Sequence, residues 1–337
     1  MEKISNTELK ALQAKGFFNS ERNVFSDAMP TFTAQNIGMP AGILTALNPQ
    51  AVENILALRT GDLALGKREK LLDWADEKYF TPMIERTGQT TPYSDFGMPL
   101  VSGLNANFNE TGHYRFTAKY QHGNLEAAQY QKGRINYQAF LLSAVTEALA
   151  VELNNVAFNG YINNSSGSYI CYGLLNNPEL PNYTAAGSKT FDTMTWQEVM
   201  NFFTGAVTKL TQQTGNNING ESRIRVVISA SAFNSLKSKW TDLGISAYEK
   251  LQQLYPNMYF VSAIEFDNAY NGTANVIYFI GESNAGGIAD STKLGYSELA
   301  LAGNVVQTDN GYSQAISAGT CGALVFKPSF IVRYKGI

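Results

Sequence analysis

The segment 137–159 constrains the fold more than any other part of the sequence. Its apolar residues recur at i, i+3 and i+4 spacing, which predicts a helix of roughly 33 Å. Gly160 directly after Asn159 supplies a stop signal. A helix of this length can serve as the spine of a domain. The polar residues expected mainly on its opposite face are Ser143, Thr146, Glu147 and Asn154.

Helical and strand patterns alternate through the second half of the chain. Thr195, with Glu198 three residues later, forms a capping box that opens a helix. From Leu294 to the end the pattern is β, with a turn expected at 309–311, which read Asp-Asn-Gly. The mixture corresponds to the α+β class. The elements expected before this β region are helix 195–214, strand 223–229, helix 230–239, helix 247–254, strand 258–266 and strand 275–280.

The first 125 residues have few patterns typical of an independent core. Residues 1–48 are polar and interrupted by prolines, so we expect an arm that needs a partner surface to become ordered. A helix is expected at 49–60, with Pro49 in its first position, and a weaker one at 66–80. Residues 81–125 contain brief β-like runs between glycines and prolines. A long β-hairpin loop that leans on another chain fits this pattern.

The composition is compatible with extensive burial against other chains. Charged residues make up 16% of the 337 residues, and there are 18 Tyr and 19 Phe. Interface cores are depleted in charge and enriched in aromatic residues, although an ordinary aromatic-rich fold would account for the same values. A chain of this length is expected to form two subdomains or more.

Charge, hydropathy and cysteine content exclude several classes of protein. A net charge of −3 does not indicate a sequence-reading nucleic-acid binder, but it is compatible with a shell that encloses DNA without gripping it. The N-terminus lacks the apolar stretch of a secretory signal, and no run of about 18 apolar residues indicates a membrane span. Cys171 and Cys321 do not make a disulfide framework. We expect both to be small buried residues in a protein of a reducing compartment.

Two arrangements that resemble catalytic motifs lack the features that the chemistry needs. Gly61–Lys67 matches the G-x-x-x-x-G-K part of a phosphate-binding loop, but Arg68 stands where the magnesium-binding hydroxyl is required. Glu147 and Glu152 lie five residues apart on the expected long helix and point in different directions. We expect them on a solvated or interface surface, and not as a general acid/base pair.

The two histidines do not indicate a metal site. His113 and His122 are nine residues apart in a region expected to be β, which places them on opposite faces of a strand. No cysteine pair or His-Glu-x-x-His sequence accompanies them. A surface or interface position is the preferred interpretation for each. We therefore expect no catalytic residue, no metal and no cofactor.

Three stretches with distinctive motifs follow one another along the chain. They are Thr91–Gly97 (TPYSDFG) followed by Asn105–Phe108 and Tyr114–Phe116, then Ile135–Tyr137 leading into the helix that closes on Asn155–Gly160, and finally Tyr172–Leu180 (YGLLNNPEL). In their residues, order and spacing they resemble the tailed-bacteriophage major capsid proteins with the Hong Kong 97-type fold. The resemblance covers roughly residues 80–337 and is weaker in the second half.

The resemblance implies an α+β capsid fold in which one domain is inserted into another. An A-domain near the capsomer axis would separate the two parts of a peripheral P-domain, so that the spine helix and the distant C-terminal strands share one core. The implied parts are an N-terminal arm at 1–48, an N-terminal helical segment at 49–85, an extended E-loop hairpin at 86–120, the P-domain at 121–160 and 291–337 with its spine helix at 137–159, and the A-domain at 161–290.

The function implied by the resemblance is assembly. Copies would associate as hexamers and pentamers and close into an icosahedral shell around double-stranded phage DNA, without binding a specific DNA sequence. The shell belongs to the virion and would be assembled in the cytoplasm of the host bacterium. Scaffolding, portal and decoration proteins are further partners to consider, and no membrane is involved.

The contacts between copies are expected to involve the E-loop and the arm. The E-loop would lie over the P-domain of the neighbouring subunit, and the arm would lie across another. Buried aromatic residues usually carry interface energy. The E-loop residues expected to make these contacts are Tyr93, Asp95, Phe96, Phe108 and Tyr114.

Two other functions stay open from the sequence. An encapsulin-type compartment shell shares the fold but encloses a cargo enzyme, and the three motifs favour the phage proteins over it. A soluble α/β enzyme is the alternative from another class, but it has no motif in its favour. A tail protein or a minor head protein is a similarly disfavoured alternative.

Some members of the fold crosslink a lysine of the E-loop to an asparagine of a neighbouring subunit. Here no lysine occurs between Lys78 and Lys119. We therefore predict that mature particles contain no isopeptide crosslink from this loop. On a denaturing gel they should give a band for the single chain, and a ladder of covalent multimers would show the prediction to be wrong.

Overall fold

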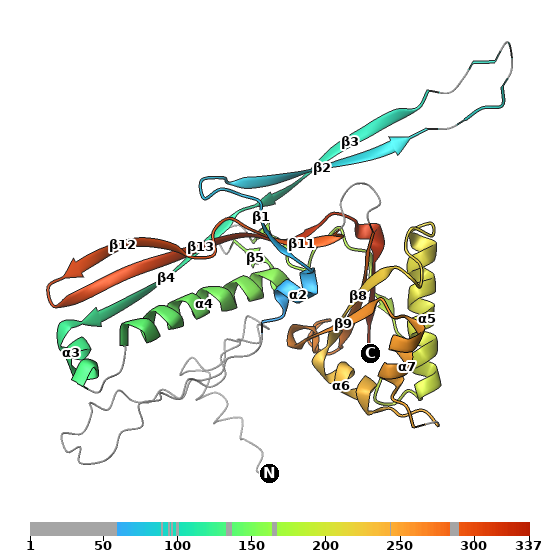
Figure 1. The fold of residues 1–337 in the computed structure, drawn as a ribbon. Coiled ribbons are helices and arrows are strands. Elements are labelled where there is room, and N and C mark those ends of the chain that lie inside the picture. Colours follow the sequence, from blue (N-terminus) through green and yellow to red (C-terminus); the bar gives the residue numbers. More distant parts are fainter. Residues whose placement is uncertain are drawn as a thin grey trace. The chain divides into compact units, whose positions relative to one another are not determined.

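The computed structural model, shown in Figure 1, describes residues 59–337 with short gaps. The arm predicted at 1–48, and nearly all of the helix predicted at 49–60, lie outside the described residues. The gaps are residues 89, 94, 96, 99–100, 133–136, 164–166, 243 and 284–289, and the side chains of 85–87 are not described either.

The long helix α4 spans Tyr137–Asn159, as predicted, and packs against a sheet. Val145 and Leu149 on α4 form a small core with Ile316 and Ala318 of the sheet. The helix ends where predicted because Gly160 adopts a positive φ of 67°, which costs a glycine little. Spacing along the sequence thus predicted both the extent of this helix and the position of its end.

The sheet under α4 is built around one long strand, β13 (Gly311–Val325). All strands that touch β13 are antiparallel to it. The predicted turn before Gly311 connects it to its neighbour β12. The other strands of this sheet are β4 (Tyr114–Gly123), β12 (Leu301–Thr308), β11 (Thr292–Tyr296) and β1 (Arg68–Lys70), of which β1 pairs in parallel with β11.

A second five-stranded sheet has the order β7-β14-β10-β8-β9 and lies between two hydrophobic cores. Its central strands are apolar on both faces because both faces are covered. Val226 and Phe279 pack with residues of α5, whereas Val227 and Tyr278 face Phe158 near the end of α4. The strands are β7 (Thr184–Ala185), β8 (Arg223–Ser229), β9 (Met258–Ala263), β10 (Val276–Glu282) and β14 (Ile331–Lys335).

The helices beside the second sheet confirm the helix predictions for this region, whereas the strand predicted at 258–266 ends at Ala263. The capping box of Thr195 and Glu198 is formed, and it starts α5 one residue later. The strand predicted at 223–229 and the helix predicted at 247–254 have those bounds. The helices are α5 (Trp196–Gln213), α6 (Ala230–Ser238) and α7 (Ala247–Leu254), followed by a 3₁₀ turn at Ile264–Phe266.

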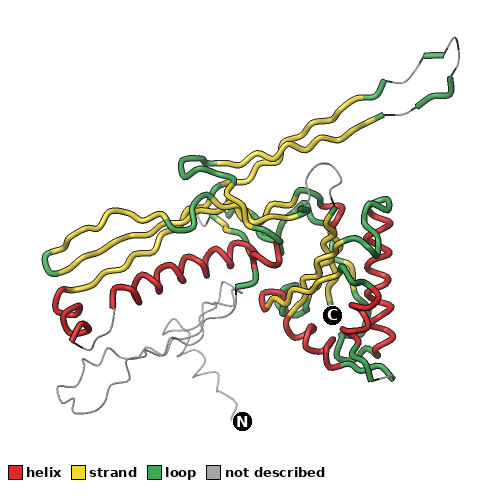
Figure 2. Tube along the Cα trace, viewed as in Figure 1, coloured by secondary structure: helices red, strands yellow, loops and turns green. Residues whose placement is uncertain are grey.

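A separate two-stranded hairpin overlaps the region 81–125 predicted to be a long β-hairpin loop and begins three residues before it. Its strands β2 (Lys78–Thr87) and β3 (Gly103–Gly112) pair over their whole length, from Lys78 opposite Gly112 to Thr87 opposite Gly103. Figure 2 shows them as a long pair of extended segments. Among the described strands, β2 and β3 form a sheet with each other alone. One residue, His113, connects β3 to β4.

The helix predicted at 66–80 was wrong. A short helix α2 (Gly61–Leu65) precedes it and ends at Gly66, whose φ is 94°. The chain then pairs with β11 as β1, and Leu72 is buried with Cys321 and Leu324. These contacts with distant residues override a weak helical pattern. The remaining elements are α3 (Asn124–Lys132), which was not predicted, and the short strands β5 (Tyr161–Ile162) and β6 (Tyr169–Cys171), with a 3₁₀ turn at Pro328–Phe330.

Asn154 is buried, although the pattern placed it on the polar face of the long helix. Its Oδ1 accepts a hydrogen bond from the backbone N–H of Gly61 at 2.9 Å, and its Nδ2 donates to Glu265 at 2.5 Å. A buried amide that is hydrogen-bonded at both ends costs little. Asn154 therefore joins α4 to the start of α2, a role that helix periodicity does not predict.

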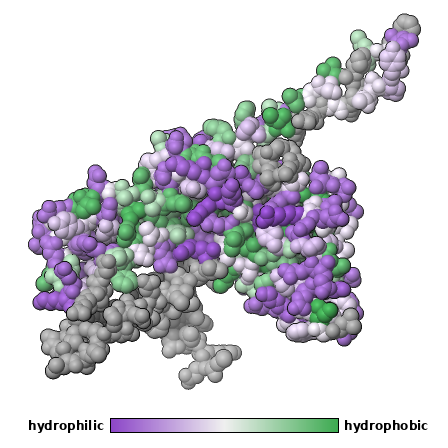
Figure 3. All heavy atoms as spheres, viewed as in Figure 1, coloured by the Kyte–Doolittle hydropathy of each residue, from purple (hydrophilic) through white to green (hydrophobic). Residues whose placement is uncertain are grey.

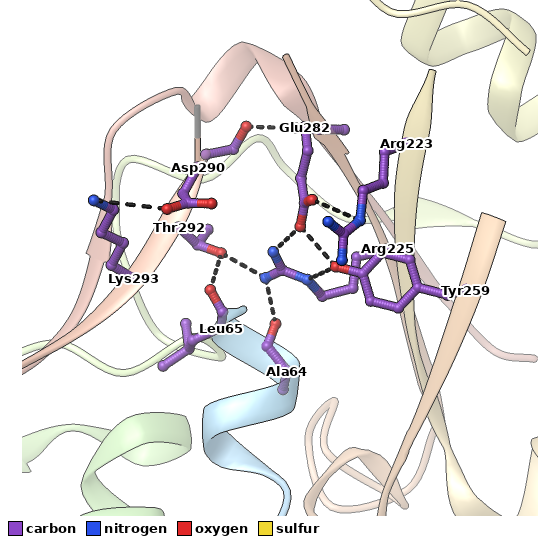
Figure 4. Close-up of polar contacts among 11 residues, drawn as sticks. Ala64, Leu65, Arg223, Arg225, Tyr259, Glu282, Asp290, Thr292 and Lys293 are labelled. Carbon is purple, nitrogen blue, oxygen red and sulfur yellow. Dashed lines mark hydrogen bonds and ion pairs between the residues drawn. The ribbon is translucent and has the colours of Figure 1, made fainter. Parts of the chain in front are cut away.

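One buried arginine links α2 to both sheets, as Figure 4 shows. The side chain of Arg225 on β8 is 1% exposed and forms an ion pair with Glu282 on β10. Its Nε donates to the hydroxyl of Tyr259 at 2.7 Å, and its Nη1 donates to the carbonyl of Ala64 and to Thr292 Oγ1, each at 3.1 Å. Every direction of the guanidinium thus meets an acceptor, which is what a buried charge requires.

Replacing Arg225 with methionine should destabilise the chain strongly. The variant leaves the Glu282 carboxylate, which is 11% exposed, without its buried partner, and removing one partner of a buried pair costs about 3–5 kcal/mol. The free energy of unfolding of the unassembled chain in urea measures this loss.

Arg223 supplies a matched control, because it pairs with the same Glu282 at 3.2 Å but is 66% exposed. Arg223→Met should cost less than about 1 kcal/mol, as exposed pairs do. Equal losses for the two variants would contradict the role given to Arg225.

Candidate inter-subunit interface

The β2–β3 hairpin has one strongly apolar face. Residues directly opposite each other in the pairing share a face, and Pro82 stands opposite Phe108 while Ile84 stands opposite Ala106. Phe108 is 64%, Ile84 65% and Leu104 71% exposed. Figure 3 shows hydrophobic residues on the surface along this hairpin. The charged residues Lys78 and Glu110 stand at the base end of this face. Its described apolar residues, called the apolar hairpin face below, are Phe80, Pro82, Ile84, Leu104, Ala106 and Phe108.

The opposite face of the hairpin is polar and partly covered by the same chain. Asn105, Asn107 and Asn109 alternate with the apolar residues of β3. Near the hairpin base, Asn109 and Thr111 line a small cavity of about 40 Å³ together with residues of 172–179 and the end of β13. The chain therefore covers part of the polar face and leaves the apolar face open. This is the reverse of what a hairpin that functions alone requires.

The hairpin end carries three of the residues predicted to make contacts. Tyr93 is 93% exposed, and Asp95 is exposed. Met98 and Val101 beside them are as exposed as Tyr93. Phe96 lies outside the described residues. An aromatic side chain with this exposure is available for contact with another molecule.

Tyr114, the fifth predicted contact, packs within its own chain. It lies at the start of β4, where its ring stacks on Tyr161 with centroids 3.7 Å apart, and its hydroxyl donates to Glu152 at 3.3 Å. Burial, with the Glu152 carboxylate beside it, raises the pKa of Tyr114. Phe108, Tyr93 and Asp95 thus belong to one hairpin. Tyr114 lies outside it, at the start of β4.

His113 holds the hairpin base. Its Nδ1 lies 2.7 Å from the carbonyl oxygen of Asp76, which can only accept, so Nδ1 carries the proton. Nε2 then accepts from the hydroxyl of Ser297 at 2.8 Å. Burial lowers the pKa of His113, and the Arg115 guanidinium lowers it further, while the hydrogen bond to Asp76 acts in the opposite direction. The neutral imidazole is therefore the form that fits this position.

The predicted surface position of the histidines was wrong. His113 is 7% exposed and His122 is 6% exposed. His122 lies on β4 opposite Tyr312 of β13, on the side of the sheet that α4 covers, and Gln138 of α4 lies within 3.4 Å of its Nε2. Period-two alternation does not apply across His113, because that residue interrupts the strands. No signal in the sequence distinguishes these buried histidines from exposed ones.

The glycine-containing segment 61–67 and the two cysteines, considered above as candidate binding or catalytic groups, make structural contacts within the protein. The amide of Gly61 donates to Asn154, and the guanidinium of Arg225 lies directly against Gly66, so this glycine-rich segment has no space for a phosphate. Cys171 and Cys321 are buried, as predicted, and burial raises the pKa of each thiol to about 12. Within the described ranges, no three His, Cys, Asp or Glu residues are grouped so that they could hold a metal ion.

The family model described as Pa193 gp26 major capsid protein matches residues 30–336. The chain belongs to this family of major capsid proteins. The prediction of a phage major capsid protein is thereby confirmed. A comparison with curated proteins finds no match for this capsid protein.

Solved phage structures share the fold of this capsid protein. The capsid of Myoviridae phage XM1 is 13% identical, with a TM-score of 0.71 over 89% of this chain and 99% of that one. A chain of Mycobacterium phage Bobi is 9% identical, with a TM-score of 0.58 over 88% and 96% of the two chains. A chain of Gordonia phage Cozz is 10% identical, with a TM-score of 0.56 over 87% and 91%. The Hong Kong 97-type fold implied by the resemblance is confirmed.

The stability of the capsid protein should depend on pH through His113. Below the usual histidine pKa of 6.5, the unfolded chain binds a proton at this residue that the folded chain resists. The free energy of unfolding should therefore decrease as pH falls from about 7 to 5. In His113→Gln this contribution is absent, and urea unfolding of the unassembled protein at several pH values should show a shallower slope.

Ser297→Ala is the control for this measurement. It removes the hydroxyl that bonds Nε2 but keeps the imidazole, so the slope should persist. An unchanged slope in His113→Gln would show that the imidazole does not titrate differently on folding.

Proposed function

We propose that this capsid protein assembles as hexamers and pentamers that close into an icosahedral shell around phage DNA. The observation that carries the proposal is the apolar hairpin face, which the described part of the chain leaves uncovered. Exposed apolar patches of this kind mark surfaces that bind another molecule. In a shell protein the molecule present in the highest number is a second copy.

In this proposal the parts of the fold take the roles of the domains expected from the sequence. The hairpin of β2 and β3, with its exposed end, acts as the E-loop, expected at 86–120. α4 and the sheet around β13 act as the P-domain (121–160 and 291–337). The second sheet with α5–α7 acts as the A-domain, expected at 161–290, and β14 (331–335), from the range expected for the P-domain, completes this sheet. In this proposal the segment 49–85 leads from the arm at 1–48 into the hairpin, and its last residues belong to β2.

The E-loop of one copy lies over the P-domain of the next copy in this proposal. The contact joins two different surfaces, so it is heterologous, and repeated around an axis it generates a ring. Phe108 and Tyr93 supply the aromatic anchors, because both are exposed in the single chain. Phe96 and Asp95 contribute from the hairpin end. Tyr114 contributes by supporting the hairpin base, since its ring is already stacked on Tyr161.

The helix α4 adds to the surface that a neighbour has to cover. Among the described helices, α4 alone has the length and apolar composition to cross a membrane. Only 28% of its most apolar stretch is buried within the chain. Leu142 is 45% exposed, and Ala139, Ala144 and Ala148 are exposed as well. Exposed apolar residues that lie together on one helix indicate a surface that binds another molecule. In the shell, neighbouring copies would cover this surface.

The enclosed DNA would be held without recognition of its sequence, because the chain carries a net charge of −3. The role is structural and not enzymatic. Localisation in the virion follows from this role, and assembly would take place in the bacterial cytoplasm, with scaffolding, portal or decoration proteins as further partners. The family description names a major capsid protein, which supports the phage shell over an encapsulin-type compartment.

Electron microscopy of the purified chain, produced alone and with its neighbouring genes, tests the proposal. Closed shells with hexameric and pentameric capsomers are the expected result. A chain that stays a monomer or a small dimer under every condition would overturn it.

Phe108→Asp tests whether the apolar hairpin face makes the contact. Loss of an aromatic anchor costs about 2 kcal/mol, and about 1.4 kcal/mol corresponds to tenfold, so the yield of particles should fall roughly tenfold or more. The variant should still fold, because Phe108 is largely exposed.

Asn105→Asp adds the same charge to the polar face of the same strand and serves as the matched control. It should assemble as the original chain does. Equal yields from Phe108→Asp and Asn105→Asp, counted by sedimentation and microscopy, would exclude the apolar hairpin face as the contact.

A further inference from the structure

Strand β12 is an exposed sheet edge without the usual protection. It pairs with β13 on one side and ends the strand order of its sheet. All eight of its residues, LAGNVVQT, are exposed, and none is charged or a proline. Val305 is 61% and Val306 56% exposed, and as adjacent strand residues they lie on opposite faces of the sheet. Edge strands that function alone usually carry lysine, proline or inward charges that prevent pairing with another chain.

The hairpin contains a second edge of the same kind. Pro82 lies within β2 and has no N–H to donate, which suits a protected edge. β3 (GLNANFNETG) has no proline or lysine, and its one charged residue, Glu110, pairs with Lys78 at 3.1 Å. The backbone N–H of Phe108 donates to the Oδ1 of Asn107, next to it in the sequence, at 2.9 Å. β3 therefore presents backbone groups and alternating apolar side chains at a free edge.

A groove lies beside β12 on the side of the sheet that faces α4. It has a volume of about 510 Å³, and its walls come from α4, β4, β12 and β13. Leu142 and Ala139 form the helix side, and Val305 and Tyr312 form the sheet side. A strand added next to β12 would direct every second side chain toward this apolar rim.

We propose that β12 is a docking edge for a second copy of this chain and that strand β3 of that copy occupies it. The sheet of one capsid protein would then continue from β13 through β12 into the hairpin of the next. Backbone hydrogen bonds would supply the pairing. Leu104, Ala106 and Phe108 share one face of β3, and this face would lie on the α4 side, over Val305 and Leu142.

The observations favour β3 over other occupants. Both edges lack charged residues in their central parts, so neither repels the other. In both strands the side chains alternate between the two faces, which suits pairing. The pairing covers the apolar hairpin face and the open side of α4 at once. The inference rests on the proposed function, because it needs a neighbouring copy. It goes further by naming the strands that meet.

Disulfide trapping in assembled particles tests the proposed pairing. Ala106→Cys on β3 is combined in turn with Val305→Cys, Val306→Cys and Gln307→Cys on β12, since neighbouring strands bring Cα atoms about 4.5–5.5 Å apart, within disulfide range. The native cysteines give little background, because burial raises the pKa of both thiols to about 12. After oxidation of particles, at least one combination should give a ladder of covalent multimers on a denaturing gel.

A control combination places the second cysteine on α7, as Ala106→Cys with Gln252→Cys, and should give no ladder. Particles that form normally but give no ladder with any of the three β12 positions would overturn the pairing and leave the proposed shell intact. Absence of particles from the unmodified chain would instead count against the proposed function itself.

Hydrogen exchange of the unmodified protein gives a second measurement that needs no substitution. The backbone amides of 301–308 that point away from β13 should exchange rapidly in the unassembled chain and at least tenfold more slowly in particles, because the edge becomes paired. The amides of 104–108 that point away from β2 should slow in parallel. Rapid exchange of these amides of β12 in intact particles would contradict the proposal.

Discussion

The antiparallel pairing of β13 is the interaction on which the rest of the described structure depends. Its residues from Gly311 to Thr320 hold β4, which continues from the hairpin through His113, and its other side holds β12. Ile316 and Ala318 on this strand receive α4. Because the hairpin base, the spine helix and the edge strand all contact this one strand, they form a single unit although they lie far apart in the sequence.

The surface left over after this packing explains why the molecule functions as one of many. The described residues 59–337 bury two cores on the faces of the second sheet but leave the apolar hairpin face, one side of α4 and the edge β12 uncovered. Few charged residues are present to keep such surfaces apart. A heterologous contact between copies would complete the burial, and self-assembly follows from the same hydrophobic effect that forms the cores.

The buried polar groups of the described residues hold separate elements together. Arg225 connects α2 to both sheets, and His113 connects the hairpin to the loop at Asp76 and to Ser297. Each has its hydrogen-bonding groups matched by acceptors or donors of distant elements, as buried polar groups require. In this capsid protein the buried polar side chains, and the free-energy cost of burying them, therefore lie where separate elements of the fold meet.

The sequence by itself determined the elements whose signals are local. The limits of α4 and the capping box of Thr195 and Glu198 follow from spacing and caps, and three motifs in order were enough to indicate the family. Only the tertiary structure decided that residues 66–80 do not form a helix, that Asn154 and the histidines are buried, and that Phe108 shares an apolar face with Ile84. The physical reason is that burial and strand register depend on contacts between residues distant in the chain, which no local pattern contains.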